Sequence, residues 1–504
     1  MNANTEHFDI TIVGLGPTGG TLANLIAQCG LRVAVIEREA EMYHLPRAVH
    51  FDGETMRVFQ AVGIADQLSK KVRINPGMRF VDQHKSVILD WPRPQEIGAQ
   101  GWYPSYRLHQ PDLEILLREK LSSYSNALVK SSTEVIAADE NQNNVEVVCQ
   151  NIEDGSEERF RTKYLVGCDG AKSFIRNLIS SDLEDLGFKE KWLVVDLLLK
   201  RERPDLGDHS IQFCDSVRPM TYCRNPGNRR RWEITMLDGE TDEDITQSDR
   251  IWEFLSPWLS VDDAELERKA VYTFQSVIAD TWRKGRLMIA GDAAHLTPPF
   301  MGQGMCAGIR DASNLAWKLA LRVNGDASED ILDSYQQERA PNVRQFIETA
   351  IRLGGLINTM DSQSALGQSH SPANGAAQMS SLLPPLGTSN LDGLSSGSSP
   401  HSGYLFSQPI LSNGKRLDEE VGYSPVLIVR NKLAKSLVPK TPVLDGETNP
   451  NLINELNNLD VSAVLVRPDK YISDTAKTEE EVTKLAMLEI PKPISNIKER
   501  EITI

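Results

Sequence analysis

Three glycines at a fixed spacing are the residues of this chain best suited to binding phosphates. An apolar, β-branched run ends at Gly14, and Gly16 and Gly19 follow it directly before a segment of helical character. Gly14 permits a tight turn, Gly16 lets the backbone approach a pyrophosphate, and Gly19 lets the following helix pack against the strand. Glu37 closes the next apolar run, where its carboxylate can accept hydrogen bonds from ribose hydroxyls. The pattern predicts a dinucleotide site.

Two further strand ends carry aspartate and glycine. Asp169 and Gly170 follow one apolar run, and Gly291 and Asp292 follow another. A parallel doubly wound sheet collects its strand ends at one crevice, where an aspartate can hold a polyol chain. Each pair alone also fits an ordinary strand-ending turn, but the three segments in this order favour a single shared crevice.

Two motifs that are absent from the sequence exclude one class of dinucleotide-binding enzyme. No second GxGxxG follows a strand, and Gly302 and Gly304 with Gly308 have the wrong spacing. No cysteine pair of CxxxxC type is present. A disulfide reductase with two nucleotide domains needs both features, so that class is set aside.

Composition excludes several other classes. The chain has 504 residues, 40% of them hydrophobic, and a net charge of −16, which argues against a nucleic-acid partner held by phosphate contacts. Its first residues lack a signal-peptide pattern, and no apolar run approaches the ~18 residues of a membrane span. None of the six cysteines forms a CxxC or a Cys/His cluster. We expect a cytoplasmic protein with reduced thiols and no metal site.

The periodicity of the chain predicts its elements. We expect a βαβ start over 8–37, helices over 53–70 and 111–122, strands within 133–168, and a long helix from about Gly304 to Val323. Residues 188–237 are rich in strand signals and include a hairpin that turns at 225–228, which indicates an inserted antiparallel sheet. A Gly-, Ser- and Pro-rich stretch then precedes two apolar runs, at 425–429 and 461–466, typical of a small α/β module.

These elements divide into four parts. We predict an α/β nucleotide domain over 1–180 and 275–350, and a substrate domain over 181–274 with parts of 72–106. A linker or arm covers 351–403, and a C-terminal module covers 404–504.

Longer motifs carry a family resemblance. The segments Leu45-Pro46-Arg47-Ala48, Asp52-Gly53-Glu54-Thr55 and Gly291-Asp292-Ala293-Ala294-His295 resemble single-component FAD-dependent aromatic hydroxylases. The branch they resemble contains 3-(3-hydroxyphenyl)propionate hydroxylases and phenol hydroxylases, over about residues 7–345. The resemblance implies a Rossmann-like FAD domain of the glutathione-reductase type and a thioredoxin-like C-terminal module, here without CxxC.

The resemblance also implies the cofactors. FAD would be tightly bound, and NAD(P)H would visit as the electron donor. Arg107 resembles the basic contact near the flavin phosphates, Asp292 would hold the ribityl chain, and Arg47 is a candidate contact for the nicotinamide nucleotide. The helix from Gly304 would direct its positive end to the flavin. The cofactor residues implied in total are Gly14, Gly16, Pro17, Thr18, Gly19, Glu37, Arg38, Arg47, Arg107, Asp169, Gly291, Asp292, Pro299, Gly302, Gly304 and Met305.

The implied reaction is hydroxylation of a phenolic ring by O2 through a C4a-hydroperoxyflavin. Pro298 and Pro299 would form a rigid wall that shields the flavin. A base that removes the phenolic proton activates the ring, and the candidates are Asp52, His50 and His295. Asp52 has an alternative role as the N-cap of the following helix, and we expect His295 to be structural.

Substrate contacts are expected on the inserted sheet. Phe213 and Tyr222 are candidates for an aromatic pocket, although any strand in a core can carry such residues. Arg224 and the run 229–231 form a basic cluster, which fits a solvated ribbon or the attraction of an anionic substrate or NAD(P)H phosphates.

Two alternative functions remain open at this point. A flavoenzyme of the same fold can remove a ring substituent, such as a nitro group, during hydroxylation, whereas the halogenase WxWxIP signature is absent. The chain can also be a non-catalytic FAD-binding or assembly protein, since the polar arm and C-terminal module suit assembly. A homodimer is possible.

Overall fold

A parallel sheet brings the three predicted strand ends together. The computed structural model describes residues 6–42, 45–359, 377–389, 399–434, 437–488 and 490–493. Its first sheet holds, in spatial order, β8 (Ala127–Lys130), β2 (Val33–Ile36), β1 (Glu6–Val13), β11 (Glu157–Gly167) and β18 (Leu287–Ile289), all parallel. Strands β9 (Thr133–Glu140) and β10 (Val145–Asn151) extend it beside β11, and β17 (Arg283–Lys284) pairs with β18. Because β1, β11 and β18 are neighbours, their carboxyl ends share one edge, as predicted.

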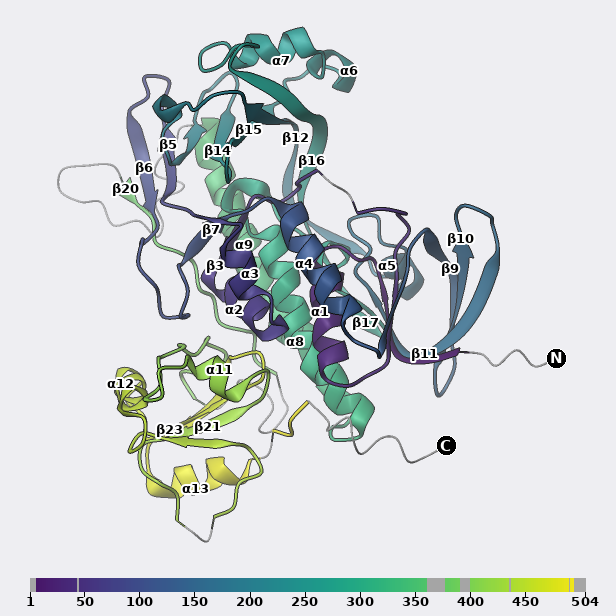
Figure 1. Cartoon of the computed structure of the whole chain (residues 1–504), viewed down its shortest axis with the longest axis vertical. Coiled ribbons are helices and arrows are strands. Elements are labelled where there is room, and N and C mark those ends of the chain that lie inside the picture. The colour runs from purple at the N-terminus through teal and green to yellow at the C-terminus, as the bar shows by residue number, and fades with distance from the viewer. Residues whose placement is uncertain are drawn as a thin grey trace.

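Long buried helices pack against this sheet (Figure 1). Helix α1 (Pro17–Gln28) is buried from Gly19 to Ala27, and its Asn24 donates to a backbone carbonyl of α4 (Gln110–Ser122). Helix α8 (Gly304–Asn324) is buried from Cys306 to Leu321 and packs on α1. Helices α5 (Phe174–Ile179) and α9 (Asp330–Thr359) also belong to this part. The predicted helix over 53–70 is two helices, α2 (Gly53–Val62) and α3 (Ala65–Ser69), because Gly63 adopts a left-handed conformation.

The inserted sheet has nine strands and also takes in segments far from it in sequence. Its spatial order is β19 (His295–Leu296), β16 (Ala264–Ala279), β12 (Leu183–Leu199), β15 (Arg229–Thr235), β14 (Met220–Arg224), β13 (Ser210–Phe213), β5 (Gly77–Val81), β6 (Val87–Pro92) and β20 (Ala377–Gln378). All pairs are antiparallel except β13 with β5 and β20 with β6. Helices α6 (Asp242–Ile245) and α7 (Ser248–Leu255) share a hydrophobic cluster with one face (Figure 1).

A small three-stranded sheet links the two large ones. It consists of β3 (His50–Asp52), β7 (Ser105–Arg107) and β4 (Arg73–Ile74). Its register places His50 opposite Arg107.

The predicted linker is largely structured where it is described. Helix α9 continues past the predicted boundary at residue 351 to Thr359, because the apolar side chains of Leu353 and Leu356 remain in the core. The division into domains stays a prediction. Residues 377–389 run along the first domain, where Asn342 donates to the carbonyls of Pro384 and Pro385. Residues 360–376 and 390–398 lie outside the described residues.

The C-terminal module is a mixed sheet with helices. Its strands lie in the order β22 (Val443–Asp445), β21 (Val426–Val429), β23 (Ala463–Val466) and β24 (Ile472–Ala476), with α11 (Leu417–Val421), α12 (Pro450–Asn458) and α13 (Glu479–Met487). The described residues between β21 and β22 contain no helix, and the thioredoxin-like assignment stays a prediction. Among the described residues, no helix is both long and apolar enough to cross a bilayer.

Candidate active site

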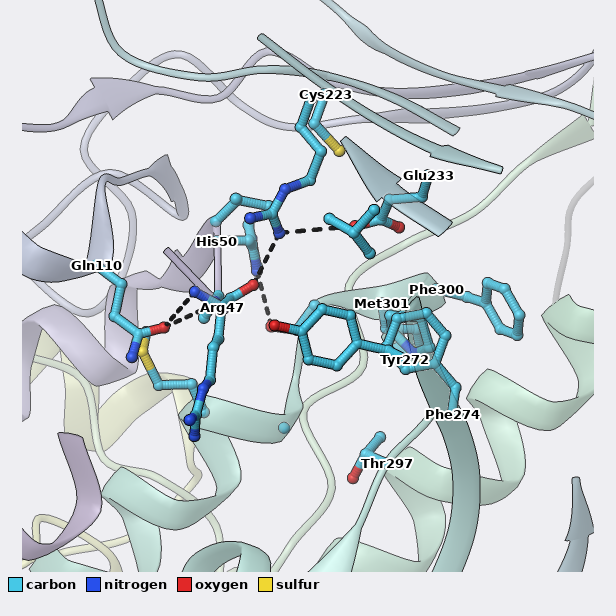
Figure 2. A pocket seen from close by; sticks show the side chains of 18 of the residues that line it. Arg47, His50, Gln110, Cys223, Glu233, Tyr272, Phe274, Thr297, Phe300 and Met301 are labelled. Atoms are coloured by element: carbon cyan, nitrogen blue, oxygen red, sulfur yellow. Dashed lines mark hydrogen bonds and ion pairs between the residues drawn. The ribbon is translucent and has the colours of Figure 1, made fainter. Parts of the chain in front are cut away.

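A cavity of about 500 Å³ lies at the carboxyl ends of the parallel strands, between the two large sheets. One half, which we call the fingerprint half, is lined by Gly16, Pro17, Thr18, Cys168, Gly170, Ala171, Asp292, Gly304 and Met305. The other half, the sheet half, is lined mainly by side chains of the nine-stranded sheet, among them Gln212, Thr221, Cys223, Arg231, Glu233, Arg268, Tyr272 and Phe274. Figure 2 shows side chains that line this cavity, among them Cys223, Glu233, Tyr272 and Phe274 of the sheet half.

The glycines in and beside the fingerprint half are of two kinds, those required by packing and those that leave space in the cavity. A Cβ on Gly14, which has φ +98°, would lie 2.5 Å from the carbonyl oxygen of Cys168, and a Cβ on Gly19 would lie 2.0 Å from that of Gly14. These two glycines are therefore required by packing. A Cβ on Gly16 or Gly304 would meet no atom within 4 Å, because both face the open cavity. Their missing side chains leave a cradle that fits a bulky ligand lying against backbone.

Two helix N-termini reach this cradle. Helix α1 begins after Gly16 and helix α8 after Gln303, and neither has a side-chain hydrogen bond at its N-cap. Free N–H groups and the positive ends of both helix dipoles therefore face the cavity, which favours phosphate or another anionic group. This arrangement fits the diphosphate and the ring system of a dinucleotide.

Glu37 lies at the end of β2, next to the fingerprint turn. Its carboxylate accepts hydrogen bonds from the backbone N–H of Leu15, at 2.7 Å, and of Glu39, at 2.9 Å. It thus holds the turn from beside the cradle, where a ribose would lie. Arg38 is exposed and pairs with Glu39 at 3.1 Å. The cofactor contacts of Glu37 and Arg38 stay predictions.

Asp292 opens directly into the cavity from a 3₁₀ turn over Gly291–Ala293. Its side chain is exposed only toward the cavity, and desolvation by the surrounding protein raises the pKa of its carboxyl. The turn is held from behind by Asp311 of α8, which accepts from the backbone N–H of Gly291 at 3.0 Å and lies 2.6 Å from His295 Nε2. Arg339 donates to the same carboxylate at 2.8 Å. His295 therefore has a structural position, as predicted.

The carboxylate of Asp169 forms hydrogen bonds with residues that follow it closely in the sequence. Its carboxylate accepts from the hydroxyl of Ser173 and the backbone N–H of Phe174, at 2.5 and 2.7 Å, at the start of α5. Its neighbours Cys168 and Gly170 line the cavity, and Asp169 itself does not. Its predicted contact with the cofactor has no support from this geometry.

His50 lines the cavity but has no free nitrogen. Its Nδ1 lies 3.1 Å from the carbonyl oxygen of Gly302, and its Nε2 lies 2.8 Å from the hydroxyl of Ser105. The carbonyl only accepts, so Nδ1 carries the proton and the serine hydroxyl donates to Nε2. Burial, with the nearby charges of Arg107 and Arg93, lowers the pKa of His50 to about 3. His50 is thus placed to fix the loop at Gly302, and the prediction that it acts as a base is not supported.

Asp52 also has a structural position. One oxygen accepts from the N–H and the hydroxyl of Thr55, both at 2.9 Å, which makes Asp52 the N-cap of α2. The other oxygen pairs with Arg310 of α8. Although burial alone would raise it, Arg310 holds the pKa of Asp52 at about 2, and the side chain does not line the cavity. The geometry favours the capping alternative over the catalytic one.

Arg107 lies in the sheet half, away from the predicted phosphate site. Its guanidinium donates to the hydroxyl of Ser210 on β13. Its strand β7 pairs with β3, which brings it beside His50. Arg47 points into the cavity in Figure 2, with its backbone N–H held by Gln110 at 3.1 Å.

The three predicted substrate residues lie on the face of the sheet that is turned away from the cavity. Phe213 packs on Trp258 with ring centroids 5.0 Å apart, and Tyr222 packs on Trp232 at 4.8 Å. Arg224 donates to carbonyls of its own hairpin turn. Side chains alternate along a strand, so the adjacent residues Gln212, Thr221 and Cys223 line the cavity instead. The geometry therefore gives no support to substrate contacts of Phe213, Tyr222 and Arg224, although their strands border the cavity.

Of the two prolines predicted to shield the flavin, only one lines the cavity. Pro299 lines the cavity with Phe300 and Met301, whereas Pro298 is buried behind them. Pro298 is therefore not a wall residue of the cavity.

Glu233 is the functional candidate that the sequence analysis missed. It lies on β15 with its carboxylate in the sheet half, 3.7 Å from Arg231. Burial raises its pKa despite Arg231, and a carboxyl with a raised pKa in a cleft is a candidate acid or base. The alternation of Trp232 and Ile234, which are fully buried, with Arg231 and Glu233 was the available signal.

The fold and the cradle together define a dinucleotide-binding protein of the Rossmann-like type. The chain belongs to the FAD-binding domain family, whose family model matches residues 7–350. FAD is therefore the resident dinucleotide, and the cradle fits it.

Particular relatives share most of the chain. It is 38% identical over 361 residues to the probable NADH-specific resorcinol 4-hydroxylase of Rhodococcus jostii (strain RHA1), covering 71% of this chain and 67% of that protein. It is 34% identical over 359 residues to the 3-(3-hydroxy-phenyl)propionate/3-hydroxycinnamic acid hydroxylase of Burkholderia cenocepacia (strain HI2424), covering 71% and 65%. The alignments thus span about two thirds of these relatives.

A solved structure extends the similarity to nearly the whole chain. The flavin-dependent monooxygenase PieE, in complex with FAD and substrate, superposes with a TM-score of 0.78 at 19% identity, covering 96% of this chain and 98% of that one. At this identity the match supports the fold, including the presence of a C-terminal module.

Proposed function

We propose that this chain is an NAD(P)H- and O2-dependent flavin monooxygenase that hydroxylates a phenolic ring. The observation that carries the proposal is the continuity of the cavity, which runs from the dinucleotide cradle to a half lined by aromatic and polar side chains. A ring bound in the sheet half therefore lies next to the site of the flavin. The names of both sequence relatives support this reaction class, and the Rhodococcus relative favours NADH as the donor.

The residues that would hold FAD are those of the cradle. Gly16, Pro17 and Thr18 would face the diphosphate, Asp292 the ribityl chain, and Gly304 with Met305 the ring system. Bound FAD would take two electrons from NAD(P)H and deliver one atom of O2 to the ring.

The balanced reaction defines which atoms, electrons and protons are transferred. One oxygen atom enters a ring C–H bond as a hydroxyl, the other leaves as water, and NAD(P)H supplies the two electrons. Removing the phenolic proton raises the electron density of the ring carbons that are attacked. Glu233 is the residue we assign to this proton, because its raised pKa makes it a stronger base than an ordinary carboxylate.

The sheet half must also exclude water. Pro299 and four larger apolar or aromatic side chains line the cavity there. The four are Phe300, Met301, Tyr272 and Phe274, which Figure 2 labels. Tyr272 and Phe274 are stacked, with an angle of 7° between their ring planes. These side chains bury a ring and keep solvent from the reacting atoms.

The test is a purified protein that is yellow from FAD and oxidises NAD(P)H faster when a suitable phenol is added. A panel of resorcinol, 3-(3-hydroxyphenyl)propionate and phenol, with products identified by mass spectrometry, measures it. A protein that neither retains nor takes up FAD contradicts the proposal, and so does an FAD-loaded protein that no phenol stimulates. The cytoplasmic location and the homodimer stay predictions.

A further inference from the structure

Two arginines of the sheet half lack a carboxylate partner among the described residues. Arg107 is 7% exposed, donates one N–H to the hydroxyl of Ser210, and leaves its Nε without a hydrogen-bond partner. Arg93 stacks on Trp91, with its guanidinium carbon 4.0 Å from the ring centroid, and donates to the hydroxyl of Ser381 at 2.5 Å. Both guanidinium groups line the cavity.

Two further arginines of this half, both buried, are neutralised. Arg231 makes a two-pronged contact with Asp196, at 2.7 and 3.0 Å, and Arg268 lies 3.6 Å from the same carboxylate. Glu233 adds a second negative group beside Arg231. Asp52 and Glu233 act electrostatically on Arg93 and Arg107, respectively, without contacting them. Among the described residues, Arg93 and Arg107 are thus cations of this end of the cavity that no carboxylate contacts directly.

Such a pair is costly in the free protein. Burial lowers the pKa of Arg93 to about 10, and the charge of Arg107 adds to this lowering while Asp52 opposes it. A cation that is held partly out of water with no carboxylate in direct contact destabilises a fold. Guanidinium groups bind carboxylates and other oxyanions through parallel N–H donors. The missing partner is therefore expected to come from outside the chain.

We propose that Arg93 and Arg107 form a subsite for an oxyanion of the aromatic substrate. The inference rests on the proposed function, and it adds that the substrate is bound as an anion. The oxyanion is either a carboxylate substituent or an ionised ring hydroxyl. The cradle for the FAD diphosphate is in the other half of the cavity, so the subsite is free for the substrate.

The experiment measures ligand binding to the FAD-loaded protein, by the change in flavin absorbance, and needs no turnover. The first arm compares 3-hydroxybenzoate with 3-hydroxybenzamide, which has the same shape and no charge. The second arm measures resorcinol binding from pH 6 to 10. The variants are Arg93→Met and Arg107→Met. Arg224→Met is the matched control, since Arg224 lies on the same sheet and faces away from the cavity.

The subsite predicts one of two patterns. With a carboxylate as the source, 3-hydroxybenzoate binds at least tenfold more tightly than the amide, and either cavity variant removes this preference. With an ionised hydroxyl as the source, resorcinol binds more tightly as the pH rises toward the pKa of its hydroxyl group. In the wild-type protein this increase in affinity occurs at a lower pH than in either cavity variant. Arg224→Met keeps the wild-type behaviour in both cases.

Two results overturn the subsite. One is that the wild-type protein shows neither pattern, or that both cavity variants show the same pattern as the wild-type protein. The other is a loss of FAD affinity in Arg107→Met with unchanged ligand preference, which would make Arg107 a cofactor residue. Anion preference without any hydroxylated product would instead refute the proposed function and leave the subsite standing.

Discussion

The hydroxyl of Tyr471, in the C-terminal module, donates a hydrogen bond to the carboxylate of Glu54 at the start of α2. Glu54 in turn accepts from Arg310 of α8 at 2.7 Å, and Arg310 donates to Gln303 at the N-cap of α8 at 3.0 Å. The module is thereby connected to the helix end that borders the flavin cradle. A second link, Arg57 to Asp418 at 2.5 Å, holds the same two parts together.

Removing the Tyr471 hydroxyl is expected to loosen this connection. Tyr471→Phe loses a buried hydrogen bond to a charged group, which costs about 1.5–3 kcal/mol of stability. We expect a lower melting temperature and weaker FAD binding, measured by thermal unfolding and by flavin fluorescence. Tyr404→Phe is the control, because Tyr404 is exposed. Unchanged FAD affinity in Tyr471→Phe would show that the module does not support the cradle.

The two kinds of glycine give separable effects. Gly16→Ala places a methyl group in the open cradle, so we expect FAD affinity to fall about tenfold or more, ~1.4 kcal/mol. The stability of the FAD-free protein should not change, because the backbone of Gly16 is extended. Gly19→Ala puts a Cβ 2.0 Å from the carbonyl of Gly14 and is expected to cost about 1–3 kcal/mol of stability. Urea unfolding and FAD titration separate the two, and equal loss of stability in both variants would contradict this division.

The register of the inserted sheet can be tested at adjacent residues. Cys223 faces the cavity and Tyr222 faces the opposite cluster. Cys223→Phe is expected to raise the KM for the phenol at least tenfold while FAD binding remains. Tyr222→Phe should leave kcat/KM within about twofold, since its ring still packs on Trp232. The reverse outcome would restore the predicted face, with Tyr222 in the pocket.

Glu233 is expected to set the low-pH limb of activity. A base works when deprotonated, so kcat/KM should rise with pH through the raised pKa of Glu233. Glu233→Gln is expected to lower kcat by about 10²–10⁴-fold and to remove this limb, whereas Glu233→Asp should retain a limb. A full set of rates from pH 5 to 9 measures both. A Gln variant with the wild-type pH profile would rule Glu233 out.

Acid should unfold the protein through its buried carboxylates. Burial alone would raise their pKa values, but their cationic partners hold Asp52, Asp311 and Glu338 at about 2, below their ordinary 3.8 to 4.5. The unfolded chain thus binds these protons more tightly than the folded chain. Their stabilisation is complete above about pH 4.5 and is lost as the pH falls toward 2. Urea unfolding between pH 3 and 7 should show it, and a flat profile below pH 4.5 would contradict it.

The sequence predicted those features that depend on the residues of a single strand, helix or turn. The fingerprint turn, the common edge of β1, β11 and β18, and α8 all follow from local patterns of apolar residues and glycine. Side-chain direction in β13 to β15 did not, because a shift of one residue exchanges the two faces and each face carries aromatic and basic residues. The roles of Asp52 and His50 depended on partners far away in sequence, Arg310 and Ser105, which no local pattern reveals. Glu233 was missed for the same reason, since its importance comes from burial in a cavity that several segments build.

The most direct test of the account follows the oxygen atoms. The FAD-loaded protein is supplied with NADH, a phenol of the active class and ¹⁸O2, and the product and cofactor are quantified. The proposed monooxygenase reaction predicts a ring that gains one hydroxyl containing ¹⁸O, with one NADH consumed for each product molecule. A product hydroxyl derived from water, or NADH consumption that yields only hydrogen peroxide with every phenol tested, would contradict it.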